Sequence, residues 1–183
     1  MSAASRRGDA QSAAPDALIR DATAADFPAL LALNAESVHF LSPLDLPRLQ
    51  RLHAQAAYHR VIERGGRVAA FLLALREGAD YDSPNYRWFA RRYRRFLYID
   101  RVVVAQSCQG RGLGAQLYAD IIAFAAAGGS AVLTCEFDLE PPNPASAKFH
   151  AHHGFREVGR QWLGAGEKQV SLQAREVRAS SSV

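Results

Sequence analysis

Residues 102–115 read Val-Val-Val-Ala-Gln-Ser-Cys-Gln-Gly-Arg-Gly-Leu-Gly-Ala, and this stretch decides the fold. It begins in the apolar run 96–104, which is typical of a buried strand, and continues through a basic turn into a helix expected from Gly112 onward. Backbone N–H groups at such a helix start bind anions. At Gly110, Gly112 and Gly114 a Cβ would obstruct the turn or the approach of a ligand. The stretch therefore predicts a phosphate-binding turn between a strand and a helix.

The spacing of these glycines argues against two common nucleotide sites. It is not G-x-G-x-x-G, and no acidic residue about 20 positions further on supports a nicotinamide fold. The turn also lacks the G-K-[ST] of a P-loop. The remaining alternative is that the glycines serve only a tight turn.

Hydrophobic periodicity and turn residues predict one mixed α/β domain at 17–175, between disordered tails at 1–16 and 176–183. The hairpin at Gly65-Gly66 requires antiparallel neighbours, whereas the strand–helix–strand unit around the glycine turn requires a parallel pair. Strands are expected at 17–20, 58–64, 67–76, 96–104, 131–137, 155–162 and 167–172. Helices are expected from Thr23 to near His39 and at 43–56, 87–95, 112–128 and 145–152.

Composition indicates a soluble globular protein. The chain has 183 residues, 49% apolar and 22% charged, enough to form a core without a disulfide or a metal. Cys108 and Cys135 are too isolated for a disulfide framework or a zinc site, and are expected to be free thiols in a reducing compartment. With no long apolar run and no signal-like start, we expect a cytoplasmic protein without membrane contact.

The net charge of +4 comes from arginine, since only two of the 22 basic residues are lysine. Part of this charge is concentrated in a segment where arginines alternate with aromatic residues, which would suit RNA through phosphate contacts and stacking. No nucleic-acid module is recognisable, so we favour a short amphipathic helix whose arginines face solvent or an anionic ligand. The segment contains Arg87, Trp88, Phe89, Arg91, Arg92, Tyr93, Arg94, Arg95 and Phe96.

Two motifs together resemble the GNAT superfamily of N-acetyltransferases. Residues 109–114 (Gln-Gly-Arg-Gly-Leu-Gly) resemble its Q/R-x-x-G-x-G/A signature. Residues 143–150, followed by Gly154-Phe155, resemble its second motif, N-x-x-x-x-x-[FL]-Y with a later G-F. The resemblance covers about residues 17–173. It implies a mixed, mostly antiparallel sheet with a parallel, splayed central strand pair and flanking helices.

The resemblance also implies acetyl-CoA as acyl donor, with no metal. The backbone of the strand end would hold the pantetheine arm, the glycine turn would hold the pyrophosphate, and a later helix would line the far side. Carried over residue by residue, these positions are Val102, Val103, Val104, Gln109, Gly110, Arg111, Gly112, Leu113, Gly114, Ala115, Asn143, Ser146 and Phe149.

Most relatives carry a tyrosine, thought to protonate the coenzyme A thiolate, where this chain has His150. Histidine, with a pKa near 6.5, would also serve as an acid, although it is mostly deprotonated above pH 7. A thiol pKa near 8.5 makes the thiolate a fair leaving group without help. The alternative is that His150 is merely a polar helix residue.

Glu136 is the candidate base or water-positioning group, because relatives carry a glutamate where the sheet splays. An ammonium acceptor with a pKa of about 10 is neutral about once in a thousand molecules at pH 7, which costs roughly 4 kcal/mol. The alternative for Glu136 is a structural pair with an arginine such as Arg101, and Asp100 is the next candidate base.

The acceptor site is expected between residues 36–44 and the insertion 80–88. Its tyrosines, carboxylates and tryptophan would suit a small polar or cationic acceptor, or would simply lock the loop. The candidate acceptor residues are Glu36, Tyr81, Tyr86, Trp88 and Asp100.

The sequence thus predicts an acetyl-CoA-dependent N-acetyltransferase, a monomer or homodimer that does not bind nucleic acid. Its acceptor would be the amine of a small molecule or a peptide N-terminus, attacking the donor directly. The alternatives are an acyl-CoA-binding module without turnover and, less favoured, an RNA-binding protein.

Overall fold

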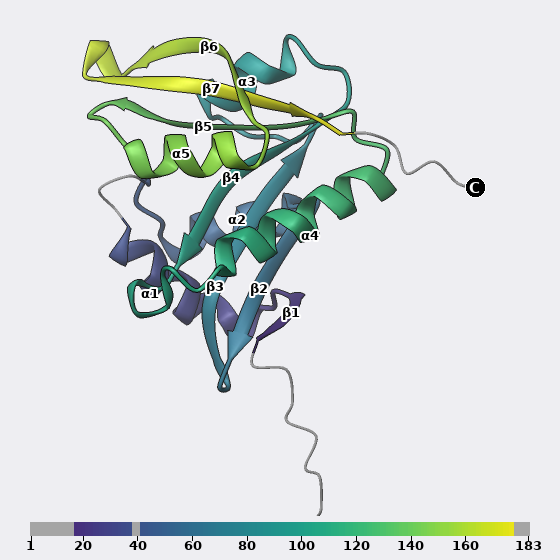
Figure 1. Ribbon diagram of the computed structural model, residues 1–183, viewed down its shortest axis with the longest axis vertical. Helices are drawn as coiled ribbons and strands as arrows, with labels where there is room; N and C mark the ends of the chain where they lie inside the picture. The colour runs from purple at the N-terminus through teal and green to yellow at the C-terminus, as the bar shows by residue number, and fades with distance from the viewer. Residues whose placement is uncertain (1–16, 38–40, 178–183) are drawn as a thin grey trace, which may run out of the picture.

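The computed structural model describes residues 17–37 and 41–177, which form a mixed sheet with helices on both faces (Figure 1). The strands are β1 (Leu18–Asp21), β2 (Tyr58–Arg64), β3 (Arg67–Arg76), β4 (Phe96–Val104), β5 (Val132–Glu140), β6 (Arg156–Leu163) and β7 (Lys168–Glu176). The helices are α1 (Phe27–Glu36), α2 (Leu46–Gln55), α3 (Pro84–Ala90), α4 (Leu113–Ala127) and α5 (Pro144–His152). Short 3-10 turns lie at η1 (Ala24–Asp26), η2 (Gln106–Cys108) and η3 (Gly164–Gly166).

The strand order in the described part is β1-β2-β3-β4-β5-β7-β6, with β4 and β5 parallel and the other neighbours antiparallel. This confirms the predicted mixed, mostly antiparallel sheet in an α/β domain. The predicted tail at 1–16, and the predicted end of the first helix near His39, lie outside the described residues. Of the predicted tail at 176–183, Glu176 ends β7 and the Val177 N–H donates to the Ala131 carbonyl, while 178–183 lie outside the described residues.

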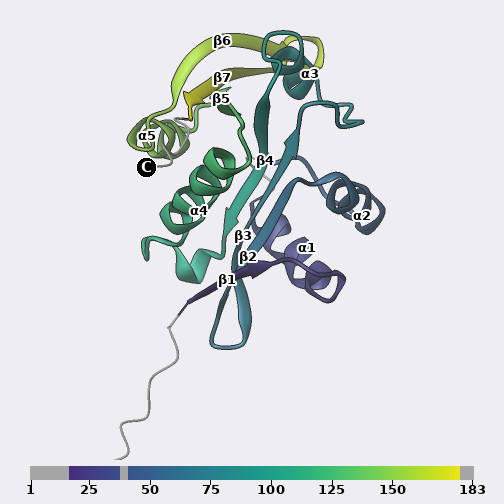
Figure 2. The ribbon, with the colours of Figure 1, turned by 90° about the vertical axis from the view of Figure 1, so that its right-hand side faces the viewer.

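The central strand β3 is buried on both faces because helices cover both sides of the sheet. Figure 2 shows α4 and α5 on one side and α1 and α2 on the other. Leu72 of β3 packs in the cluster that includes α4, whereas Phe71 packs in the cluster that includes α1 and α2, and neither is exposed. The uninterrupted apolar run of β3 follows from this double coverage. Within the described residues, no helix is long and apolar enough to cross a membrane.

The helix predicted at 87–95 is wrong in its bounds. Ser83 caps α3 by accepting a hydrogen bond from the Tyr86 N–H, and Pro84 occupies the first turn, so the helix begins early and ends at Ala90. The remaining arginines follow the helix in an exposed turn. The Arg92 guanidinium lies 3.6 Å from the centre of the Trp88 ring and covers that ring face. That face is therefore not free to stack on a base.

Parallel pairing between β4 and β5 is short. Phe96, Leu97 and Tyr98 pair with residues 132–134, and beyond these pairs the strands separate. On its other edge β4 stays paired with β3 as far as Val104, with Asp100 as an extra, bulged residue. The predicted splay of the central pair is confirmed, and it leaves one edge of β4 open.

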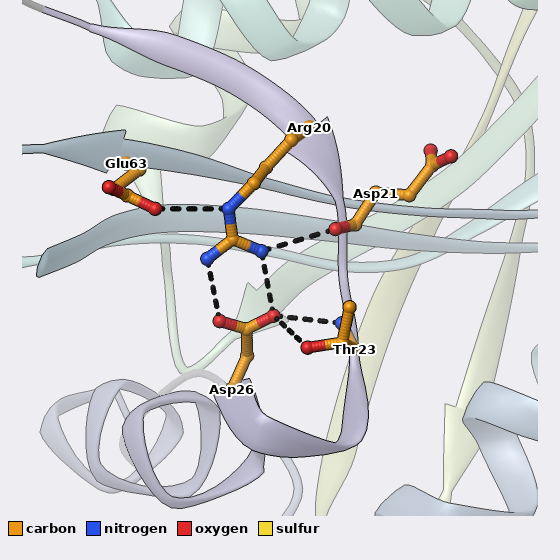
Figure 3. A network of polar contacts seen from close by, with 5 residues as sticks. All are labelled: Arg20, Asp21, Thr23, Asp26 and Glu63. Atoms are coloured by element: carbon orange, nitrogen blue, oxygen red, sulfur yellow. Dashed lines mark hydrogen bonds and ion pairs between the residues drawn. The ribbon is translucent and has the colours of Figure 1, made fainter. Parts of the chain in front are cut away.

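A polar network ties β1 to the start of α1 (Figure 3). Arg20 donates two hydrogen bonds of 2.8 Å to the Asp26 carboxylate and one of 3.0 Å to Glu63 of β2. Asp26 also accepts from the N–H and the hydroxyl of Thr23. The Arg20 guanidinium holds the pKa of Asp26 well below its usual range. The ionised carboxylate therefore stabilises the folded state.

Asp26→Asn is expected to lower the free energy of unfolding at pH 7 by about 2 kcal/mol, because it weakens a largely buried ion pair. Because the pKa of Asp26 is lower in the folded than in the unfolded protein, its full contribution to the free energy of unfolding is present above the unfolded pKa of about 3.9. This contribution is lost as the pH falls toward the folded pKa. Urea unfolding should therefore show the difference shrinking at pH 3. Asp21→Asn, which removes an exposed ion pair with Arg60, is the control and should cost less than about 1 kcal/mol. Equal effects of the two variants would contradict this assignment.

Candidate active site

A cavity of about 780 Å³ occupies the gap between β4 and β5. One part of its wall comes from α4 and α5, and another comes from residues 41–43 before α2 and residues 81–85 around the start of α3. Figure 2 shows α4 and α2 on opposite faces of the sheet. Because residues of both helices line the cavity, the cavity passes through the sheet. Two different molecules would thus reach the gap from opposite sides.

The open edge of β4 turns backbone groups toward this cavity that pair with no neighbouring strand, although the Val104 carbonyl accepts a 3.5 Å hydrogen bond from the Gln109 side chain. The Ala105 N–H donates to the Ala69 carbonyl on β3, and N–H directions alternate along a strand. Val102 and Val104 therefore turn their N–H and C=O groups toward the gap, while Val103 faces β3. Such an edge pairs with an extended, amide-bearing chain.

The glycine turn before α4 has the geometry of an anion site. Gly110 and Gly112 have φ of 73° and 76°, in the left-handed region, and a Cβ on either would meet no atom within 4 Å. The space beside both residues is therefore open to a ligand. At the helix start the N–H groups of residues 113–115 have no intrahelical acceptor, because the first helical bond runs from Gln116 to Gly112.

Gly114 serves packing as well as access. A Cβ there would lie 3.3 Å from Cζ of Phe149, so a glycine is needed to let α5 approach α4. Asn143 caps α5 by accepting a 3.1 Å hydrogen bond from the Ser146 N–H. Phe149, Asn143 and Ser146 all line the cavity.

Most of the residues predicted to hold the coenzyme border this one cavity. Four do not: Leu113 points into the core with 3% exposure, Arg111 and Gly112 are exposed, and Ala115 is partly buried. At those four positions the backbone N–H groups, or the charge of Arg111, could still contact a ligand bound at the turn. The predicted residues that line the cavity are Val102, Val103, Val104, Gln109, Gly110, Gly114, Asn143, Ser146 and Phe149.

Glu136 borders the cavity just beyond the last β4–β5 pair. Its Oε1 accepts a 2.9 Å hydrogen bond from the Tyr98 hydroxyl, and its Oε2 is shielded from solvent. Burial of the carboxyl raises the pKa of Glu136 to about 7, against the opposing effect of hydrogen bonds from Asn85 and Tyr98. Near neutral pH the Glu136 carboxyl is therefore present in both its protonated and its ionised form.

Arg101 pairs with Asp100 and not with Glu136. Its Nε lies 2.6 Å from the Asp100 carboxylate, and another nitrogen donates to Asn34 Oδ1 at 2.8 Å. Tyr81 donates a short hydrogen bond to the same carboxylate. Asp100 and Tyr81 line the cavity, but this ion pair occupies Asp100 and leaves Glu136 as the carboxylate without an arginine.

Three residues predicted to bind the acceptor lie away from the described cavity wall. Glu36 is exposed and accepts from the Gln106 N–H, while Tyr86 is buried and donates to the Arg76 carbonyl at 2.7 Å. Trp88 packs over Gly159, where a Cβ would lie 2.5 Å from its ring. Tyr86 and Trp88 therefore fix local structure, and their role in acceptor binding stays a prediction.

His150 is buried, with 5% exposure, and both of its ring nitrogens are engaged. Nδ1 lies 2.8 Å from the Ser146 carbonyl, which only accepts, so Nδ1 carries the proton. Nε2 then accepts from the Tyr118 hydroxyl, 2.8 Å away. Burial lowers the pKa of His150, so the ring is neutral at pH 7. In this state its one ring proton is held by the Ser146 carbonyl and Nε2 presents only a lone pair, so the predicted acid role would require a second proton on the ring.

Sequence reasoning missed several polar residues of the cavity wall. Tyr98 reaches Glu136 from the neighbouring strand, and Lys168 pairs with Asp138 at 2.9 Å across β5 and β7. Only Tyr118 had a local signal, since it lies four residues after Gly114 on the same face of α4. Within the described residues, no three His, Cys, Asp or Glu side chains gather as metal ligands.

A model of the Acetyltransferase (GNAT) family matches residues 19–155, most of the described chain. The chain belongs to the GNAT family. The match spans the glycine turn, Glu136 and α5, and ends just before β6, which accords with the resemblance noted in the sequence. A comparison with curated protein sequences found no match to this GNAT protein.

Solved structures share the fold of this GNAT protein. The ribosomal-protein-S18-alanine N-acetyltransferase from Escherichia coli has a TM-score of 0.68 and 16% identity, over 91% of this chain and 98% of that one. The ribosomal-protein-alanine N-acetyltransferase from Brucella melitensis has a TM-score of 0.65 and 26% identity, over 87% and 99%. A putative acetyltransferase from Salmonella typhimurium, solved with its cofactor acetyl-CoA, has a TM-score of 0.67 and 19% identity, over 92% and 98%.

The raised pKa of Glu136 predicts a pH-dependent cost to stability. A carboxyl whose folded pKa of about 7 exceeds its unfolded value destabilises the protein as pH rises between the two values. Relative to wild type, Glu136→Gln should therefore gain roughly 3 kcal/mol in unfolding free energy between pH 4 and pH 8. Urea unfolding measures this change, with exposed Glu140→Gln on the same strand as the control. A pH-independent difference would place the Glu136 pKa near its ordinary value.

Proposed function

We propose that this GNAT protein transfers an acetyl group from acetyl-CoA to the amine of a small molecule or a peptide N-terminus by direct attack. The observation that carries the proposal is a single cavity that links the glycine turn of α4 to Glu136 through the gap between β4 and β5. The donor would enter on the α4 and α5 side, and the acceptor on the α3 side.

The donor supplies an acetyl group activated as a thioester. The open edge at Val102 and Val104 suits the amide-bearing pantetheine arm, and the left-handed glycines leave room for a pyrophosphate beside the N–H groups of α4. Arg111, exposed at the turn, adds a positive charge near that site. Asn143, Ser146 and Phe149 would line the opposite side.

Glu136 would take the proton from the acceptor amine, directly or through a water molecule. A carboxylate with a pKa of about 7 is a stronger base than an ordinary glutamate and is still substantially ionised at neutral pH. The Tyr98 hydroxyl holds Oε1 in place. Glu136 would thus provide an acceptor inside the cavity for the proton whose removal from an ammonium costs roughly 4 kcal/mol at pH 7.

The tetrahedral intermediate needs a donor for its oxyanion. Between the backbone N–H groups of Val103 and Val104, the strand alternation favours Val104, because its N–H faces the gap. A backbone donor held by β3 pairing needs no reorganisation during the reaction.

The acceptor side of the cavity is polar and rich in carboxylates. Asp82, Asp100 and Asp138 line it, and each pairs with a cation of the protein. Such a wall suits an acceptor with several hydrogen-bonding groups. Two of the similar structures are named as ribosomal-protein alanine N-acetyltransferases, which supports a peptide N-terminus as one acceptor class.

Gly112→Asp should bind acetyl-CoA at least ~10-fold more weakly than Gly112→Asn, as measured by calorimetry. Asn and Asp both tolerate the left-handed region, so the pair differs mainly in a negative charge beside the proposed pyrophosphate site. Equal affinities of the two folded variants would remove the turn from the donor site.

Glu136→Gln should leave acetyl-CoA affinity unchanged and lower kcat/KM for the best amine by roughly 10²- to 10⁴-fold. In wild type, kcat/KM should show an inflection near pH 7, and the variant should lack this inflection and rise only with the fraction of neutral amine. Release of coenzyme A thiol across amines, amino acids and peptides measures turnover, with Glu140→Gln as the control. A chain that binds acetyl-CoA but turns over nothing in the panel would be an acyl-CoA-binding module.

A further inference from the structure

Tyr118 lies in the wall of the cavity on the donor side, one helical turn beyond Gly114. Its side chain is fully buried, and its ring packs against Phe149 and Phe155, with ring centres 4.7 and 5.8 Å away. Its hydroxyl meets His150 Nε2 at 2.8 Å. The hydroxyl thus lies where α4, α5 and the gap in the sheet come together.

Few titratable groups lie near the Tyr118 hydroxyl. Neutral His150 uses its Nδ1 proton on the Ser146 carbonyl and presents only a lone pair at Nε2. The other titratable groups around Tyr118 are Cys135, Glu136 and His153. Burial raises the pKa of Cys135 and lowers that of His153, so none of these groups is positively charged at neutral pH. The Tyr118 hydroxyl is therefore the hydrogen-bond donor best placed to meet a negative charge that develops here.

We propose that Tyr118 is a catalytic residue that donates a hydrogen bond to the sulfur of the departing coenzyme A thiolate, and that His150 is its positioning residue. The inference rests on the proposed function and adds to it. As the amine nitrogen bonds to the acetyl carbon, its proton passes to Glu136. The C–S bond breaks with its electron pair on sulfur, and Tyr118 keeps its own proton.

The hydroxyl turns from His150 to the sulfur because a hydrogen bond to an anion is stronger than one to a neutral nitrogen. Full proton transfer is unfavourable, since the pKa of buried Tyr118 lies well above its ordinary value and a thiol pKa is about 8.5. His150 holds the hydroxyl at the gap until the thiolate forms. A neutral side chain that only accepts hydrogen bonds is enough for this task.

The first experiment titrates the thiol of bound coenzyme A by the ultraviolet absorbance of its thiolate, and needs no acceptor. In wild type the thiol pKa should fall below its free value of about 8.5, and Tyr118→Phe should raise it by about one pH unit. Tyr58→Phe is the matched control, because Tyr58 is also buried but donates to Asp120 and is not among the described cavity-lining residues. An identical thiol pKa in wild type and Tyr118→Phe would overturn the proposal.

The second experiment measures turnover with an amine that wild type accepts. Tyr118→Phe should lower kcat by about 10-fold without changing the KM for acetyl-CoA. His150→Gln, which still offers a hydrogen-bond acceptor, should keep most of the activity. Loss of turnover in His150→Gln with normal turnover in Tyr118→Phe would make His150 the acid and overturn the proposal.

The two experiments separate the two proposals. A lowered thiol pKa that depends on Tyr118, in a chain without turnover on any amine, would refute the proposed function and leave the contact of Tyr118 with sulfur intact. Failure to bind coenzyme A would refute both.

Discussion

Three residue pairs join β4 to β5, and the cavity between the two strands exists because this pairing ends so early. Each strand keeps its outer partner, since β4 follows β3 to Val104 and β5 follows β7 to Glu140. The separation therefore removes only the hydrogen bonds between the facing edges of β4 and β5. The groups released there are the ones that an amide-bearing ligand would use. The bulge at Asp100 lies at the same level, where β4 bends away.

Opening a sheet in its middle brings polar side chains into a poorly solvated place, and most of them are paired. Arg101 lies between Asp100 and Asn34, and Lys168 pairs with Asp138. Glu136 differs, because its hydrogen-bond partners, Tyr98 and Asn85, are neutral. An isolated carboxylate is costly to ionise under these conditions. The raised pKa of Glu136 is thus a direct result of where β4 and β5 separate.

Sequence reasoning succeeded where the signal was local. The apolar runs of β3 and β4, the Gly65-Gly66 hairpin and the glycine turn all appear at their predicted places. It failed at the ends of β5 and β7, which continue to Glu140 and Glu176 through polar residues. The two strands pair with each other along this extension, and such mutual pairing overrides local preference.

In the site, too, features set by contiguous residues were predictable and contacts between distant residues were not. The turn at 109–114 and the cap at Asn143 are contiguous motifs, so their place was predictable. The contacts of Glu136 with Tyr98 and of His150 with Tyr118 join residues far apart in the chain. The packing of Trp88 over Gly159 was also not predictable, because the two residues lie far apart in the chain and on different elements.

Because the cavity passes through the sheet, different segments of the chain line its two sides, and each side can change in evolution without the other. The side proposed for the donor is lined by β4, α4 and α5, whereas the side proposed for the acceptor is lined largely by the segments before α2 and α3 and by β7. Insertions or substitutions in those segments alter the shape and charge seen by the acceptor without touching the glycine turn. Proteins with this architecture are therefore free to diverge in the molecules they modify while the donor site stays the same.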